Sequence, residues 1–232
     1  MNAVTDDTGL AATLAAVDSA LADGTYRKGG WQRFLKEARG TSRETLAALE
    51  SEITRVSNRL HAQNGFPAVP FGFAYVGELV LFAVALFLLA SDEFLMRLAG
   101  VAALGLVAQP LMKVTTGLAV GLRYSYAYLW YFEPRFKMAY GRYLLLSDTR
   151  RRLVQLSGCF GTPLALTVGA FALSDVTWIS WLAALGAAVT ALMQIAAFVA
   201  VYMGVTRVGP FLLTTLTTPA TLAAELRSSR TA

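Results

Sequence analysis

Residues 71–90 read FGFAYVGELVLFAVALFLLA, and this stretch decides the class of the protein. Its only charged side chain is that of Glu78. The Leu, Phe and Val residues, about a dozen, contribute roughly −0.3 to −0.6 kcal/mol each to insertion and outweigh one Glu, which costs about 3 kcal/mol. A helix of about twenty such residues crosses the roughly 30 Å hydrocarbon core of a bilayer. We therefore predict that this stretch spans a membrane.

Three further apolar runs follow it, at residues 94–122, 153–173 and 178–204. Short acidic turns, at 91–93 and 174–175, would join the four runs in pairs. The chain is 56% hydrophobic and 15% charged, which is too apolar for an ordinary soluble domain. We predict an all-α polytopic integral membrane protein with four transmembrane helices in two hairpins.

The composition changes along the chain divide it into five segments. We assign a cytoplasmic amphipathic helical region to 1–65, a first transmembrane hairpin to 66–122, a cytoplasmic interfacial connector to 123–152, a second transmembrane hairpin to 153–206 and a cytoplasmic tail to 207–232.

The N-terminal segment carries two apolar stripes at alternating spacings of three and four residues, typical of a coiled-coil seam. They are Leu10, Leu14, Val17 and Leu21, then Leu46, Leu49, Ile53, Val56 and Leu60. The two stripes either pair with each other as a helical hairpin or leave one stripe for a partner chain.

Residues 26–39, between the two stripes, read YRKGGWQRFLKEAR. On a helix, Trp31 and Phe34 would share one face while Lys36 and Arg39 take the other. This pattern is typical of an amphipathic helix lying in the headgroup layer, and we predict lipid contact for its apolar face.

The connector mixes aromatic and basic side chains, a composition suited to the membrane surface. Pro134 is predicted to begin a helix there. We expect contact with lipid or ligand from Arg123, Tyr128, Trp130, Arg135, Lys137, Tyr140 and Arg142. These side chains could meet anionic lipid in general, clasp a headgroup or quinone-like ligand, or form a docking surface for another membrane subunit.

The distribution of Lys and Arg predicts the orientation, because cytoplasmic segments carry the excess of these residues. Eight precede the first span, seven lie in the connector and three follow the last span, whereas only Arg97 lies near a short turn. We expect both termini and the connector in the cytoplasm, with a bacterial-type inner membrane as the location.

Polar side chains inside the spans are costly and by default indicate function. The candidates are Glu78, Gln109, Lys113 and Gln194. Counted from the turn near residue 92, Glu78 and Gln109 lie at similar depth, so we predict a hydrogen bond between them. They are either a polar clamp that fixes helix packing or part of a pathway for a solute or proton. Four spans are few for a pore, so permeation would need an oligomer.

Other chemistry is poorly supported. The chain has one cysteine and one histidine, and its carboxylates are scattered, so we expect no catalytic set, no metal site and no cofactor. A net charge of +5 could suggest nucleic acid, but the basic residues flank the spans and we expect no such partner.

We therefore expect a non-enzymatic membrane subunit or scaffold that associates with anionic lipid headgroups and partner proteins, as a homo-oligomer or within a larger complex. The alternative is a small oligomeric transporter or channel using Glu78, Gln109 and Lys113. A lipid-modifying membrane enzyme is the third hypothesis.

Overall fold

The computed structural model of the protein describes residues 7–27, 29–130, 133–209 and 211–228. The chain is mostly helical, at 74%, and four helices are long and apolar enough to cross a membrane. The prediction of a mostly helical chain with four helices able to span a membrane is confirmed.

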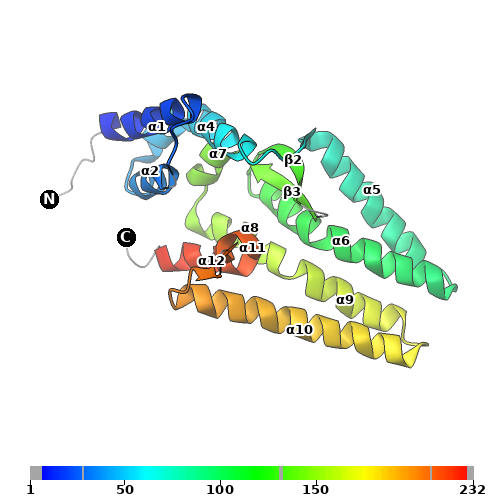
Figure 1. Ribbon diagram of the computed structural model, residues 1–232. Coiled ribbons are helices and arrows are strands. Elements are labelled where there is room, and N and C mark those ends of the chain that lie inside the picture. The colour runs from blue at the N-terminus through cyan, green and yellow to red at the C-terminus, as the bar shows by residue number, and fades with distance from the viewer. Residues whose placement is uncertain (1–6, 28, 131–132, 210, 229–232) are drawn as a thin grey trace.

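The four candidate spans form a row (Figure 1). In chain order they are α5 (Phe71–Leu89), α6 (Phe94–Ala119), the pair α8 (Asp148–Cys159) and α9 (Gly161–Ala172), and α10 (Thr177–Tyr202). The third span is thus two helices that meet at Phe160. In the row, α6 and α9 lie between α5 and α10.

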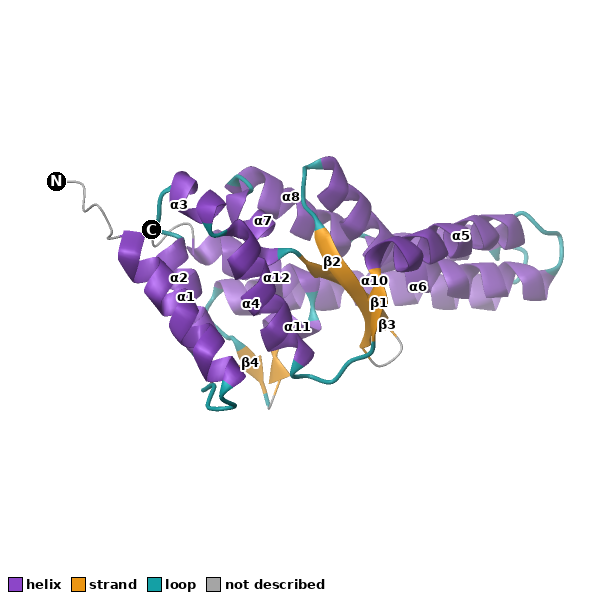
Figure 2. Cartoon of the chain, turned by 90° about the horizontal axis from the view of Figure 1, so that it is seen from above, coloured by secondary structure: helices purple, strands orange, loops and turns teal. Residues whose placement is uncertain are grey.

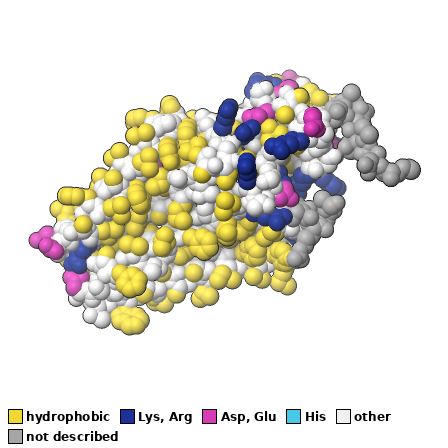
Figure 3. All heavy atoms as spheres, turned by 180° about the vertical axis from the view of Figure 1, so that it is seen from behind, with side chains coloured by type: hydrophobic (Ala, Val, Ile, Leu, Met, Phe, Trp, Pro, Cys, Tyr) yellow, Lys and Arg dark blue, Asp and Glu magenta, His cyan; other side chains and the backbone are white. Residues whose placement is uncertain are grey.

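The outer helices of the row pack against one neighbouring span each but leave most of their apolar surface uncovered by protein. Only 11% of the apolar window of α5 and 6% of that of α10 are buried, against 39% for α6. Figure 3 shows hydrophobic side chains along the length of the spans and most of the visible Lys and Arg side chains gathered at one end of the molecule. Hydrocarbon would solvate such bare apolar faces, which in water would be an aggregation liability.

Close approach of α9 to α6 depends on glycine. A Cβ on Gly161 would lie 2.3 Å from Cα of Gln109, and one on Gly169 would lie 2.6 Å from Cγ1 of Val101. Small residues at such crossings let the two backbones approach.

The N-terminal helices are α1 (Asp7–Ala22), α2 (Gly30–Ala38), α3 (Arg43–Ala48) and α4 (Glu50–Ala62). They bury one core formed by Leu10, Leu14, Val17, Leu21, Trp31, Phe34, Ala38, Leu46, Ile53 and Val56. The two predicted stripes therefore contribute to a common core within one chain.

The expected lipid contact of α2 is wrong. Phe34 is 0% and Trp31 8% exposed, because the apolar face of α2 belongs to the core that it shares with α1, α3 and α4. The ring of Trp31 stacks on Phe34, with centroids 5.0 Å apart, and meets Tyr140 edge-on at 5.6 Å. An amphipathic helix can bury its apolar face in lipid or in a protein core, and α2 buries it in the N-terminal core.

The connector departs most from expectation. It contains β2 (Tyr124–Trp130) and β3 (Glu133–Met138), which form an antiparallel three-stranded sheet with β1 (Ala68–Pro70) in the order β1-β2-β3 (Figure 2). Helix α7 (Tyr140–Leu145) follows. The predicted helix at Pro134 is wrong, since Pro134 pairs with Leu129 in an edge strand, where a missing N–H is tolerated. The expected all-α fold is corrected to a helical fold with small sheets.

The C-terminal segment packs back onto the spans. It forms β4 (Arg207–Val208), β5 (Phe211–Leu212), α11 (Leu213–Leu216) and α12 (Thr218–Ser228). Ala220 and Ala223 of α12 are fully buried, and α12 lies against α8 and α10. Residues 218–228 of the predicted tail are therefore part of the helical bundle.

Candidate ligand-binding cavity

A polar cavity of about 310 Å³ lies where the sheet meets α6, α7, α8, α11 and α12. We call it the polar cavity. Its walls hold Tyr124, Tyr128, Tyr140 and Tyr143, Thr214, Thr217, Thr218 and Thr221, with Gln109, Gln155, Lys113, Arg135 and Glu225. Segments far apart in the sequence thus bring hydroxyl, amide and charged groups to one place.

Helix α6 supplies Gln109 to the cavity wall. The Nε2 of Gln109 donates to Oγ1 of Thr218 at 3.5 Å, and Oγ1 of Thr162 donates to Oε1 of Gln109 at 3.2 Å. The predicted hydrogen bond between Gln109 and Glu78 is wrong, because α8–α9 and α12 approach this amide and α5 does not. Glu78 lies outside the cavity, 7% exposed, with Oε2 bonded to no described residue.

Lys113 lies one helical turn beyond Gln109. The close packing of α8 holds its stem, since a Cβ on Gly158 would lie 3.3 Å from Cδ of Lys113. The hydroxyl of Tyr124 donates to the backbone oxygen of Lys113 at 3.2 Å. These contacts hold the backbone and stem of Lys113, and the residue forms part of the cavity wall.

The sheet supplies Arg135, whose guanidinium lies 3.7 Å from the ring centroid of Trp130. Such cation–π contact with a flat ring holds the side chain in one orientation. Tyr128, the neighbour of Arg135 across the sheet, packs against His61 with ring centroids 4.3 Å apart.

Lys137 does not line the polar cavity and contacts the N-terminal helices instead. Its Nζ donates to Oγ of Ser57 at 2.7 Å, and burial lowers the pKa of Lys137 to about 8. Nearby, Nδ1 of His61 hydrogen-bonds the Tyr126 hydroxyl at 2.9 Å. Burial, followed by the charge of Lys137, lowers the pKa of His61 to about 4. These bonds fasten the sheet to α4.

The opposite wall is a chain of hydrogen bonds through Tyr143. Its hydroxyl donates to Oε1 of Glu225 at 2.8 Å and accepts from Nε2 of Gln155 at 3.4 Å. Burial, followed by the charge of Glu225, raises the pKa of Tyr143 well above its ordinary value, so the phenol stays neutral. On its other side Glu225 faces Arg151, with Nε 3.8 Å from Oε2.

Gln155 is the least satisfied group of the cavity. It is fully buried, and its Oε1 has no hydrogen-bond partner among the described residues. A buried acceptor without a partner costs about 1–3 kcal/mol. A donor entering the cavity would remove that cost.

The charges of the cavity do not cancel. Lys113 and Arg135 are cations in the wall, and Glu225 is the anion. By count the lining therefore holds an excess of one positive charge, and Arg151 faces Glu225 from outside it. This excess favours an anionic group as the occupant.

Of the residues predicted from sequence, five line the polar cavity: Gln109, Lys113, Tyr128, Arg135 and Tyr140. Outside it, Arg123 is exposed, Trp130 lies against Arg135, and Nε of Arg142 donates to the Gly121 carbonyl at 3.0 Å. Sequence reasoning counted Tyr143 only among the aromatic residues of the connector and gave no site role to Gln155 or Glu225; Gln155, a polar residue within an apolar span, is the one with a sequence signal.

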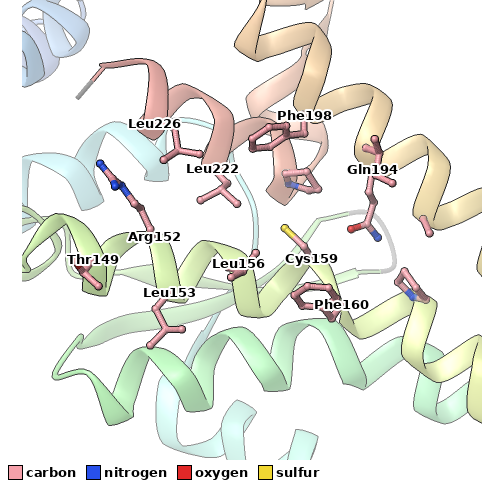
Figure 4. Close-up of a pocket in the computed structure, with 14 residues that line it drawn as sticks. Thr149, Arg152, Leu153, Leu156, Cys159, Phe160, Gln194, Phe198, Leu222 and Leu226 are labelled. Carbon is pink, nitrogen blue, oxygen red and sulfur yellow. The ribbon is translucent and has the colours of Figure 1, made fainter. Parts of the chain in front are cut away.

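A second hollow lies on the other face of α12. It is an apolar groove of about 720 Å³ between α8–α9 and α10, with α12 as its third wall (Figure 4). Gln194, the remaining predicted residue, points into this groove. We call it the apolar groove.

The described residues contain no group of three or more His, Cys, Asp or Glu side chains placed to bind a metal ion.

No known protein family, curated protein or solved structure matches this chain, so its function is argued from the cavity and the spans alone.

Proposed function

We propose that the protein is an integral membrane subunit that binds a phosphate-bearing polar group, either a lipid headgroup or a free molecule, in the polar cavity. The observation that carries the proposal is the wall itself. Lys113 and Arg135 supply two cations there, and Gln155 supplies a buried acceptor with no partner among the described residues.

Phosphate suits this wall for chemical reasons. Arg presents a planar fork of donors and Lys a compact charge, and both bind phosphoryl oxygens through charge-assisted hydrogen bonds. The Thr and Tyr hydroxyls add neutral donors. The Oε1 atom of Gln155 can accept a hydrogen bond, which a hydroxyl or ammonium group beside the phosphate would donate. The expected ligand class is therefore a phosphate ester with a small polar substituent.

We also propose that the polar cavity faces the cytoplasm. The excess of Lys and Arg before the first span and in the connector favours a cytoplasmic location for both termini, and two hairpins would then hold the spans. In a bacterial-type inner membrane the inner leaflet carries anionic headgroups at that level.

Thermal unfolding of the purified full chain in neutral detergent tests the proposal. We expect glycerol phosphate to raise the melting temperature, because a ligand that binds only the folded state stabilises it. Lys113→Gln or Arg135→Gln should each weaken the apparent Kd about tenfold to a hundredfold, the effect of losing one charge-assisted hydrogen bond. The control is Arg123→Gln, which removes an equal charge from an exposed position outside the cavity.

Two further titrations separate the sources of the phosphate. A response to phosphatidylglycerol but not to glycerol phosphate would assign a lipid headgroup, whereas a response to both would admit a free ligand. If neither stabilises the protein, or if Arg123→Gln weakens binding as much as Lys113→Gln, the proposal fails.

Glu78 supports a second candidate, transport by an oligomer. Its buried Oε2 lacks a described partner at a depth where lone carboxylates are rare and mark ion or proton pathways. Proteoliposomes with a pH-sensitive dye inside would show proton flux that Glu78→Gln abolishes. Wild-type vesicles that leak no faster than empty ones would end this candidate.

A further inference from the structure

The apolar groove is built differently from the polar cavity. Leu156, Phe160 and Ile195 stand on its rim with 42%, 54% and 59% of their surface exposed, while Leu222 of α12 is 8% exposed and forms its back wall. Figure 4 shows Phe198, Leu222 and Cys159 converging on the hollow from α10, α12 and α8. The groove therefore opens sideways between two spans and closes against α12.

The polar groups of the groove are unevenly placed. Thr149 and Arg152 lie in the first turns of α8, next to its cap at Ser147, where the span begins. From there the lining is apolar except for Cys159 and Gln194. Arg152 lies at the mouth, with its Nη2 3.9 Å from Oδ2 of Asp148, and the interior is apolar; this arrangement matches an amphiphile whose charged end lies at the membrane surface.

Helix α12 separates the two hollows. Its residues Thr218, Thr221 and Glu225 face the polar cavity, and Pro219, Leu222 and Leu226 face the apolar groove. Each set follows the spacing of one helix face, so a ligand in one hollow is distinct from a ligand in the other.

We propose that the apolar groove holds one acyl chain of an anionic membrane phospholipid whose headgroup meets Arg152. Three observations commit the site to this occupant: the sideways opening between two candidate spans, the exposed apolar rim, and the single cation at the mouth. Water is a poor occupant of the groove, because an apolar lining offers it few hydrogen-bond partners. The site goes beyond the proposed function, because it lies outside the polar cavity.

Native mass spectrometry tests whether the acyl chain binds in the apolar groove. The full protein chain is first incubated with equal amounts of phosphatidylglycerol and phosphatidylcholine. Ile195→Trp should fill the groove and lower retained lipid several-fold. Leu192→Trp is its control, since Leu192 is 65% exposed on the same helix and lies outside the lining. Equal lipid retention by the two variants would overturn the proposal.

The headgroup contact has its own test. Arg152→Gln should reduce the preference for phosphatidylglycerol over phosphatidylcholine about fivefold, as expected for one cation at an anionic surface. Arg150→Gln removes the same charge from an exposed position of α8 outside the groove. If both variants lose the preference equally, general surface charge explains it and the headgroup assignment is wrong.

The single cysteine provides a measurement without mutation. Cys159 lines the groove, so alkylation by a small maleimide should slow several-fold when phosphatidylglycerol is added in detergent. Unchanged alkylation would contradict occupancy of the groove. Ile195→Trp should leave the response to glycerol phosphate intact, so failure of this site and failure of the polar cavity are told apart.

Discussion

At the scale of single residues, burial sets the protonation of two neighbouring groups where the sheet meets α4. Lys137 donates to Ser57 and has its pKa lowered to about 8, whereas His61 has its pKa lowered to about 4. For both groups the folded protein holds its proton less tightly than the unfolded chain. Stability should therefore rise with pH through each window between the folded and the ordinary pKa.

We predict that this junction weakens as pH falls from about 6.5 to 4. Across that window the unfolded chain protonates His61 while the folded protein keeps it neutral, so acid favours unfolding. Melting temperatures of wild type and His61→Gln, measured between pH 7 and pH 4, check this. The slope for His61→Gln should be flatter, and equal slopes would show that His61 does not contribute.

The partnerless acceptor of Gln155 shows why part of the cavity could not be predicted. Its type and its place in the third span were visible in the sequence, but its lack of a partner depends on Tyr143 and α12, which come from elsewhere in the chain. Lys113 was predicted because a cation inside a span is costly, and Arg135 because basic residues among aromatic ones suit the membrane surface. Glu225 was missed because its significance arises only from where α12 folds.

At the scale of elements, the spans were predictable and the strands were not. Twenty apolar residues have few fates, so length alone marks α5. In the connector, Tyr124, Tyr126, Tyr128 and Trp130 recur at every second position, which is the period of a strand. The aromatic content of the segment indicates a preference for the membrane surface, whereas its period of two indicates a strand. Pro134 then favoured a helix start, although a proline is equally suited to an edge strand.

The contact of α9 with α6 supports a prediction about glycine. Gly161→Ala would place a methyl group 2.3 Å from Cα of Gln109, so the helices must separate. Overpacking of this kind costs about 1–3 kcal/mol. In matched detergent unfolding experiments Gly105→Ala is the control, because a Cβ there meets nothing within 4 Å. Equal stability of the two variants would contradict the close packing.

A second element-level prediction concerns the turns at the far end of the spans. Arg97 donates to both carboxylate oxygens of Asp175, at 2.9 and 2.5 Å, and to the Ala172 carbonyl at 2.8 Å. It therefore ties the start of α6 to the turn after α9. Arg97→Gln should lower the melting temperature slightly, because an exposed ion pair contributes little to stability. Arg123→Gln, tested in the same unfolding assay, should change it less, and an equal loss in both would refute the tie.

The same pair predicts a pH effect of known sign. The hydrogen bond from Arg97 lowers the pKa of Asp175 below its ordinary value of 3.8. The contribution of the pair is therefore present above that value and lost as pH falls through the lower, folded pKa. Below about pH 4, wild type and Arg97→Gln should converge in melting temperature, whereas a gap that persists would assign the stabilisation to the Ala172 carbonyl instead.

At the scale of the whole molecule, the polar parts gather at one end of the spans. The N-terminal helices, the sheet and α12 all lie there, as Figures 1 and 2 show. The opposite end holds only the two turns, with Asp92, Glu93 and Asp175 as their acids and Arg97 beside them. A molecule so divided has one orientation that satisfies the excess of positive charge on the cytoplasmic side.

Cysteine labelling tests that orientation directly, because the chain contains only Cys159 and a Cys159→Ala background is free of thiols. Four exposed positions carry the reporters, Asp92 and Ser174 in the turns and Gln63 and Thr206 at the other end. In intact bacterial spheroplasts an impermeant maleimide should label Asp92→Cys and Ser174→Cys. Gln63→Cys and Thr206→Cys should react only after permeabilisation, because the distribution of Lys and Arg favours a cytoplasmic position for this end. Labelling in the reverse order would put the polar cavity outside the cell, away from anionic inner-leaflet lipid, and would remove the physical basis for a cytoplasmic phosphate ligand.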